Sequence, residues 1–271
     1  MLLVALSGCA SLHTPAERAD AQAKAGQFQP VAALAGTPVR AWLRLSPASS
    51  AASDDGAALT VYIEGDGAEW RGRFEPPADP TPDNPLPLRL ALRDPGAHVA
   101  YLGRPCQYLD AASLKQCPSI LWQRARYGEH ALTMMSAALD VLLLTASARR
   151  LNLVGYSGGG AIAALLAAQR NDVSCLVTVA APLDTDAWVS SIDIAPLAHS
   201  LNPLALAPRL ALLAQTHIAG AADDRVPART LQRFAEALPH ARMEVIEDYD
   251  HDCCWVYVWE RLRQRTCLAQ S

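Results

Sequence analysis

A serine lies between glycines directly after a short apolar run near the middle of this chain. The run Leu151–Val154 predicts a buried strand because it is brief, unbroken and ended by glycine. Gly155, Ser157 and Gly159 follow, and apolar residues at helical spacing come next. Strand, sharp turn and helix form the context in which a G-x-S-x-G turn presents a serine hydroxyl as a nucleophile. The alternative is a glycine-rich turn whose Ser157 only caps the next helix.

A nucleophilic serine needs a base that takes its proton and an acid that orients the base. Asp223 follows the predicted strand 210–218, and His251 follows the predicted strand 242–246. Parallel strands gather ligands at their carboxyl ends, so the three side chains are expected to lie close together. Another histidine after Asp223, His240, precedes a strand and is expected at the opposite end of the sheet.

The positions of apolar segments predict the elements that carry these residues. The chain has 271 residues and 51% hydrophobic content, enough for one large domain with a full core. Alternating strands and helices predict parallel pairing through right-handed crossovers. Strands are predicted at 39–45, 59–63, 98–102, 151–154, 175–180, 210–218 and 242–246, and helices at 86–93, 128–148, after Ser157, at 229–238 and at 254–265.

The region around Ser157 resembles the nucleophile turn of the α/β-hydrolase superfamily, which includes esterases and lipases. The resemblance covers residues 31–271. It implies an α/β domain with a mostly parallel central sheet, helices on both faces and a small cap at about 184–208. Residues 220–227 resemble the superfamily's G-x-x-D-x-x-V-P stretch, which implies Asp223 as the acid. Other carboxylates stay open for this role: Asp224, Asp184 and Asp186.

The same resemblance implies an oxyanion hole, a pair of backbone N–H groups that stabilise negative charge on a reacting carbonyl. One donor is the Gly158 N–H, at the start of the nucleophile helix. The other is the N–H of Asp66 or Gly67, in the loop after strand 59–63; the alternative is an ordinary D-G turn. Gly65 matches the superfamily's glycine, but Glu64 replaces its usual histidine.

Two carboxylates in this loop, Glu64 and Asp66, would oppose an oxyanion if they faced it unpaired. We therefore expect both side chains to point away from the oxyanion. A buried Glu64 needs partners, and the candidates are Arg71, Arg73 and Arg104. The alternative is that one carboxylate faces the pocket and binds a cationic group of the substrate.

The first residues of the chain indicate export. Leu6 to Cys9 resembles the bacterial lipobox, which implies a signal peptide at 1–8 and a lipidated Cys9. Residues 9–30 are polar and predict a tether ahead of the domain at 31–271, with a short helix within this segment left open. Ala10, rather than Asp, follows the cysteine, and by resemblance to Gram-negative sorting rules this favours the outer membrane, facing the periplasm.

An oxidising compartment permits disulfides among the remaining six cysteines. Cys106 and Cys117 lie in one predicted loop and are expected to pair. Cys267 is expected to pair with Cys253 or Cys254, and Cys175 to be an inert core thiol. No paired C-x-x-C occurs, so no metal site is expected.

These features predict a serine hydrolase at the bacterial cell envelope, anchored by lipid, that acts on an ester-like carbonyl of a small-molecule or lipid-like substrate. No cofactor is expected. The net charge of −4, with both signs interspersed, gives no indication of nucleic acid binding. Two alternatives stay open: a peptidase, thioesterase or acyltransferase with the same three residues, or a non-catalytic envelope lipoprotein that uses the fold as a binding module.

Overall fold

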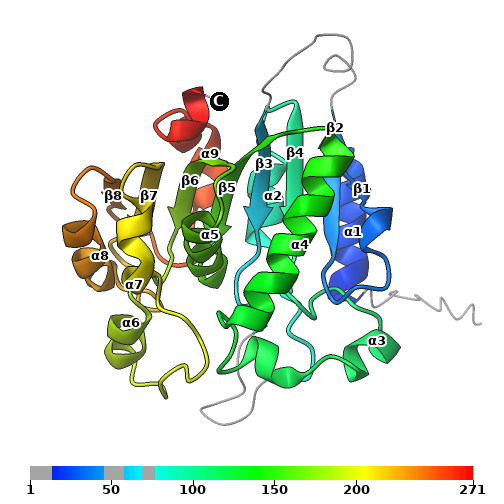
Figure 1. Cartoon of the computed structure of the whole chain (residues 1–271), viewed down its shortest axis with the longest axis horizontal. Helices are drawn as coiled ribbons and strands as arrows, with labels where there is room; N and C mark the ends of the chain where they lie inside the picture. The colour runs from blue at the N-terminus through cyan, green and yellow to red at the C-terminus, as the bar shows by residue number, and fades with distance from the viewer. Residues whose placement is uncertain (1–13, 46–57, 69–76, 271) are drawn as a thin grey trace, which may run out of the picture.

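One mixed sheet forms the centre of the molecule. The computed structural model describes residues 14–45, 58–68 and 77–270, and in these ranges the strand order is β1-β2-β4-β3-β5-β6-β7-β8 (Figure 1). From β4 to β8 in this order every neighbouring pair is parallel. At the other edge, β2 pairs antiparallel with both β1 and β4. The strands are β1 Gln29–Pro30, β2 Ala41–Leu45, β3 Ala58–Ile63, β4 His98–Leu102, β5 Arg150–Tyr156, β6 Val173–Val179, β7 Ala214–Gly220 and β8 Arg242–Ile246.

Helices cover both faces of this sheet, which confirms the expected fold class. One core joins the sheet to α4 and α5, and a second core on the other face joins it to α1, α2 and α9. Alternation along β5 places Leu153 in the first core and Val154 in the second, as a period of two requires. The helices are α1 Pro15–Ala25, α2 Leu86–Ala91, α3 Ala111–Lys115, α4 Glu129–Ala146, α5 Gly158–Gln169, α6 Thr185–Ser191, α7 Pro203–Leu206, α8 Gln232–Ala237 and α9 Trp255–Arg263.

Two predicted elements begin later than the sequence indicates. The strand expected from residue 210 begins at 214, because a 3-10 helix, Ala207–Leu210, and a short turn at 211–213 come before it. Pro208 lies in the first turn of this 3-10 helix. The helix expected from residue 229 likewise starts as a 3-10 turn, Ala228–Leu231, before α8. The remaining strands and the long helices lie where the apolar periodicity predicts them.

The prediction of a tether over residues 9–30 is wrong from residue 14 onward. Thr14 and Glu17 form a reciprocal capping box that starts α1. Ala19 and Ala23, four residues apart on one helix face, are fully buried together with Phe28. Alanines give this face little hydrophobic signal in the sequence, but their small side chains let the helix pack closely on the sheet. The predicted signal peptide and Cys9 lie outside the described residues.

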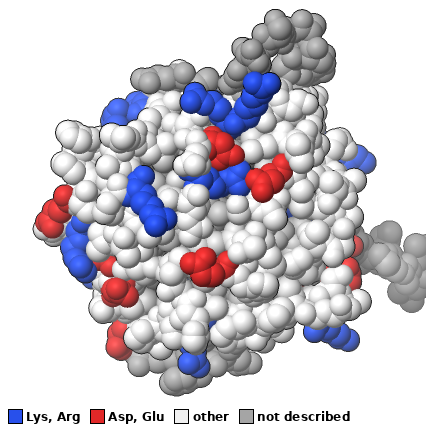
Figure 2. Space-filling model, viewed as in Figure 1, with Lys and Arg blue, Asp and Glu red and all other residues white. Residues whose placement is uncertain are grey.

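The most apolar long helix, α4, is part of the core. Among the described residues it is the one helix with the length and composition to cross a membrane. Its buried side chains recur at helical spacing and pack in the core that it shares with α5: Leu132, Met135, Leu139 and Leu142. Packing within the domain therefore accounts for its apolar composition. On the face seen in Figure 2, basic and acidic side chains are interspersed.

The described part of the chain contains three disulfides, and one of them is the expected pair. Cys106 is bonded to Cys117 with Cα atoms 5.9 Å apart. The other pairings differ from expectation: Cys175 is bonded to Cys267, and Cys253 to its neighbour Cys254.

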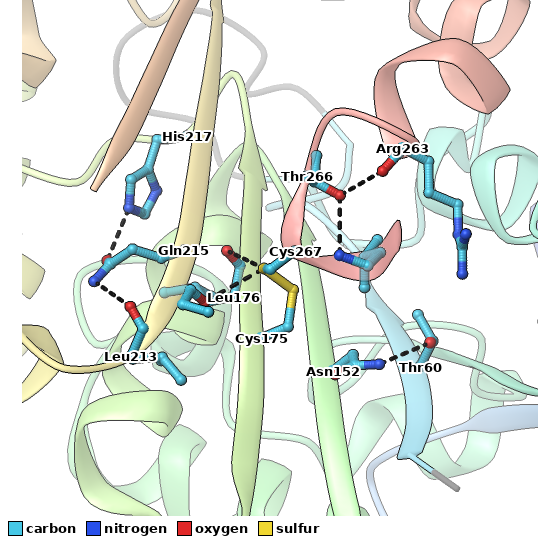
Figure 3. The surroundings of a disulfide bond; sticks show 12 residues. Thr60, Asn152, Cys175, Leu176, Leu213, Gln215, His217, Arg263, Thr266 and Cys267 are labelled. Carbon is cyan, nitrogen blue, oxygen red and sulfur yellow. Dashed lines mark hydrogen bonds between the residues drawn. A yellow bond between two sulfur atoms is a disulfide. The ribbon is translucent and has the colours of Figure 1, made fainter. Parts of the chain in front are cut away.

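The Cys175–Cys267 bond was missed because its two halves are 92 residues apart in the sequence. The chain's last turn, Cys267–Gln270, returns beside the central strand β6 and brings the two Cα atoms within 5.7 Å (Figure 3). Cys175 is therefore a cross-link from the sheet to the C-terminal turn rather than a free core thiol.

We expect the double variant Cys175→Ser/Cys267→Ser to lower the free energy of unfolding by about 4–5 kcal/mol, because the open chain regains the entropy of a long loop. Urea unfolding measures this. The matched pair Cys106→Ser/Cys117→Ser closes a much shorter loop and should lose about 3 kcal/mol. Free thiols at 175 and 267 in non-reducing peptide mapping would contradict the assignment.

Candidate active site

Ser157 occupies a strained turn between β5 and α5. Its backbone has φ 51° and ψ −130°, a conformation that residues with a side chain rarely adopt. The turn is held from both sides: the Ser157 N–H donates to the Val179 carbonyl at 2.9 Å, and the Gly160 N–H donates to the Ser157 carbonyl at 2.8 Å. The sharp strand-to-helix turn predicted from G-x-S-x-G is therefore present, at the carboxyl end of the sheet.

Close backbone contacts explain why glycine follows the serine. A Cβ on Gly159 would lie 2.4 Å from the carbonyl oxygens of Ile63 and Glu64, at the end of β3. Such a distance is shorter than any real carbon contact, so the helix start fits against β3 only as glycine. The same approach brings the next loop beside the nucleophile: a Cβ on Gly65 would lie 3.4 Å from the Ser157 Cβ.

The structure brings together the three side chains that the sequence singles out. His251 Nε2 lies 3.0 Å from Ser157 Oγ, and His251 Nδ1 lies 2.8 Å from Asp223 Oδ2. Asp223 is buried, and its other oxygen accepts the backbone N–H groups of Arg225 at 3.0 Å and Val226 at 2.8 Å. A carboxylate fixed in this way orients the imidazole, so that Nε2 faces the serine hydroxyl.

The other candidate acids lie elsewhere. Asp184 caps α6, accepting the Ala187 N–H, and pairs with Arg233 at 3.0 Å. The side chain of Asp186 accepts a hydrogen bond from Asn202. Asp224 is exposed at the rim of the pocket. Asp223 is the carboxylate that contacts the His251 ring.

Two aromatic residues that hold His251 were missed in the sequence. The Tyr156 hydroxyl donates to the His251 carbonyl at 3.0 Å and to Asp252 Oδ1 at 3.1 Å, and Trp255 Nε1 donates to the same carbonyl at 2.9 Å. Burial and the nearby Asp252 carboxylate raise the pKa of Tyr156, so its hydroxyl stays a donor. Tyr156 immediately precedes Ser157 in the G-x-S-x-G stretch, and this position in the sequence could have indicated a role in the site.

Glu64 is buried, and its hydrogen-bond partners among the described residues are a backbone N–H and two tyrosine hydroxyls rather than Arg104. Its Oε1 accepts the Gly65 N–H at 2.8 Å, and its Oε2 accepts the Tyr101 hydroxyl at 2.5 Å and the Tyr108 hydroxyl at 3.4 Å. Burial raises the pKa of Glu64 to about 7, although these hydrogen bonds favour the charged form. Arg104 bonds elsewhere, while the other two candidates, Arg71 and Arg73, lie outside the described residues.

Asp66 is the carboxylate that the arginines hold. Its Oδ1 lies 3.2 Å from Arg104 Nη1, and its Oδ2 accepts Arg126 Nη1 at 2.9 Å and the Tyr127 hydroxyl at 2.7 Å. Burial raises the pKa of Asp66, but the charges of Arg126 and Arg104 and the Tyr127 hydrogen bond outweigh it and hold that pKa below its usual range. Asp66 therefore stays ionised. Its negative charge is paired with two arginines, so it is not the unpaired carboxylate that would oppose an oxyanion.

The Asp66 carboxylate also packs against the nucleophile turn. A Cβ on Gly158 would lie 2.0 Å from Asp66 Oδ1, so glycine is needed here for contact with the carboxylate. The first N–H groups of a helix have no intrahelical acceptor, which leaves the Gly158 N–H available to a ligand. Asp66 and Gly67 line the same pocket as Ser157, and Gly67 has φ 89° with its backbone against Pro80.

A pocket of about 890 Å³ opens onto Ser157 and His251. The predicted cap supplies one wall of it, from α6 and the segment that follows: Trp188, Ile192, Ile194, Ala195 and Leu197. In Figure 1 the carboxyl ends of the parallel strands point toward the bottom of the view, where α6 and α3 lie. Within the described ranges no group of three His, Cys, Asp or Glu side chains is arranged to hold a metal ion.

Comparison with known proteins identifies the fold. A family model described as alpha/beta hydrolase fold matches residues 114–198, and no curated protein sequence matches the chain. Est1E from Butyrivibrio proteoclasticus is similar in structure, with a TM-score of 0.58, 13% identity and coverage of 88% of this chain and 96% of that chain.

Two further solved structures are similar to this chain. The Pyrococcus furiosus esterase Pf2001 has a TM-score of 0.58 and 14% identity, and the match covers 90% of this chain and 92% of that chain. A Mycobacterium tuberculosis puromycin-hydrolyzing peptidase has a TM-score of 0.56 and 17% identity; the match covers 86% of this chain and 38% of that one. At these identities the similarity concerns the fold.

We expect Glu64→Gln to change how stability depends on pH. The pKa of Glu64 rises from an ordinary 4.5 to about 7 on folding, so the folded protein holds a proton that the unfolded chain has released. This contribution to stability is fully present below about pH 4.5 and is lost as the pH rises through about 7. Over that window the wild type should lose about 3 kcal/mol relative to the variant.

Urea unfolding at a series of pH values measures the difference. Glu247→Gln, at an exposed glutamate outside the pocket, is the matched control and should follow the wild type. Parallel curves for the wild type and Glu64→Gln would contradict the assignment.

Proposed function

Because the chain has the α/β-hydrolase fold, we propose that it is a serine hydrolase acting on an ester-like carbonyl through Ser157, Asp223 and His251. The observation that carries the proposal is the continuous hydrogen-bonded path in which His251 contacts Ser157 at 3.0 Å and Asp223 at 2.8 Å. Nucleophile within reach of base, and base within reach of an orienting acid, is the geometry that nucleophilic catalysis requires.

In the proposed reaction His251 Nε2 takes the Ser157 proton as Oγ attacks the carbonyl carbon. Asp223 stabilises the imidazolium that forms and keeps Nδ1 protonated. His251 then gives its proton to the leaving alcohol oxygen as the carbon–oxygen bond breaks, which leaves an acyl group on Ser157. A water molecule, deprotonated by the same nitrogen, attacks the acyl carbonyl, and Ser157 leaves with the proton.

The tetrahedral intermediates carry negative charge on the former carbonyl oxygen. We assign its stabilisation to the Gly158 N–H and to the N–H of Asp66 or Gly67. The contact of Gly65 with Ser157, where a Cβ would come within 3.4 Å, supports this assignment because it sets the loop beside the nucleophile. Each such donor contributes about 10²–10³ in turnover.

Two of the similar structures are Est1E and Pf2001, and the second is described as an esterase. Ester hydrolysis is therefore proposed ahead of the alternatives. A peptidase with the same fold is also among the similar structures, and the three residues serve either reaction. A non-catalytic binding module would have no need of the strained Ser157 backbone with φ 51°.

We expect Ser157→Ala and His251→Ala each to reduce turnover of an activated ester by about 10⁶-fold, with the double variant little worse, because the residues act as a unit. Hydrolysis of 4-nitrophenyl butyrate measures turnover, and a fluorophosphonate probe should label the wild type but not Ser157→Ala. The exposed Ser113, at the surface helix α3, gives a control variant, Ser113→Ala, that should keep both signals. Unchanged turnover in folded Ser157→Ala would refute the proposal.

We also propose that the protein is exported and lipidated at Cys9, with the domain facing the periplasm from the outer membrane. The motif at Leu6 to Cys9 supports this, and so does the pairing of all six remaining cysteines in disulfides, which persist in oxidising compartments. Stable anchoring needs more than one acyl chain, as bacterial lipidation supplies.

Cys9→Ser should yield an unprocessed or soluble protein, because the modified thiol is lost. Membrane fractionation and intact mass measure the outcome in a Gram-negative host, with Ser11→Ala as the control that should stay anchored. The same fractionation and mass for Cys9→Ser and wild type would remove the proposal.

A further inference from the structure

The pocket over Ser157 has two chemically different walls. The cap wall is apolar and includes Trp188, Ile192 and Leu197. The second wall is the segment before α4, which contributes Arg124 and Arg126. A substrate that fills the pocket therefore meets hydrocarbon on one side and positive charge on the other.

Hydrogen bonds and an ion pair within the protein fix the basic wall in place. Arg126 is buried, with Nε donating to the Gln123 carbonyl at 2.7 Å and Nη1 contacting Asp66 at 2.9 Å. Its own backbone carbonyl accepts a hydrogen bond from Arg104 Nη2. Two guanidinium groups thus share the one carboxylate of Asp66, so positive charge exceeds negative charge beside Gly158.

Arg124 adds a second positive charge at the pocket rim. Its side chain is exposed, and no residue in the described ranges forms an ion pair or hydrogen bond with its guanidinium group. Its backbone is fixed, since the Arg124 carbonyl accepts the Ser200 hydroxyl at 2.7 Å. Arginine forks bind carboxylate and phosphate groups through two parallel hydrogen bonds.

The acidic side chains of the pocket do not cancel this charge. Glu64 is buried against tyrosine hydroxyls, and Asp252 pairs with Arg225 at 3.3 Å. Asp224 is exposed, but it follows β7, whereas Asp66 follows β3, and β5 with Ser157 lies between these strands. The pocket is therefore positive on the β3 side of the nucleophile and negative on the β7 side.

We propose that the substrate is an amphipathic ester with an apolar group against the cap and a carboxylate or phosphate group held by Arg124 and Arg126. This rests on the proposed serine hydrolase function and deepens it. A cationic substrate group on the β3 side of Ser157 is disfavoured, because the two carboxylates there, Glu64 and Asp66, already have partners within the protein.

Matched ester pairs test the proposal with the full-length protein. Mono(4-nitrophenyl) glutarate carries the anion on the acyl side, and its methyl ester is the neutral counterpart. For the alcohol side, 4-butyryloxybenzoate is compared with methyl 4-butyryloxybenzoate. The corresponding phosphate-bearing phenyl ester extends the second arm. Each kcat/KM is divided by the hydroxide-catalysed rate constant of the same ester, which removes differences in intrinsic reactivity.

We expect the anionic member of at least one pair to be preferred by about tenfold or more, equivalent to about 1.4 kcal/mol. Arg124→Gln should reduce that preference several-fold, and added salt should weaken it in the wild type. Arg209→Gln, at an exposed arginine outside the pocket, should keep the wild-type ratio.

Hydrolysis of the neutral esters with no anionic preference in either pair would overturn the inference and leave the proposed function standing. An anionic preference that Arg124→Gln does not alter would also overturn it, because the charge would then be read elsewhere. If no ester of either charge is hydrolysed and the fluorophosphonate probe does not label Ser157, the proposed function itself fails.

Discussion

The approach of the Ser157 turn to the end of β3 is the constraint on which the rest of the candidate site depends. Gly159 lies so close to the Ile63 and Glu64 carbonyls that no side chain fits between them. This contact fixes the start of α5, and it also fixes where the chain must go after β3. The serine and the loop that faces it are therefore positioned by one piece of packing, at the edge where parallel strands end.

Two carboxylates follow that contact, and the protein stabilises them in opposite ways. Glu64 is surrounded by tyrosine hydroxyls, which donate hydrogen bonds but bring no positive charge, so burial dominates and raises its pKa. Asp66, two residues later, is held by two guanidinium groups and stays ionised. Glu64 is buried against Tyr101 and Tyr108, and the charged Asp66 lies beside Gly158 with its charge paired, so no uncompensated carboxylate of this loop faces Ser157.

Local sequence signals predicted the features that depend on short-range chemistry. Ser157 and the strand and helix around it follow from glycine spacing and apolar periodicity, and the placement of Asp223 and His251 follows from where their strands end. The features that were missed depend on long-range contacts. The Cys175–Cys267 bond and the role of Trp255 at the His251 carbonyl join segments whose proximity no local pattern encodes. The packing of α1 into the core was missed because alanines carry little apolar signal.

The core on the face of α1, α2 and α9 is assembled from the two extremes of the described chain. Ala19 and Phe28 from the beginning share it with Trp259 and Leu268 from the end. This face of the sheet is covered only when α1, α2 and α9 have all packed on it, whereas α4 and α5 on the other face lie near each other in the sequence. Contacts between segments far apart in the sequence carry a large loop-closure cost, so this core is expected to form after the more local packing of α4 on α5.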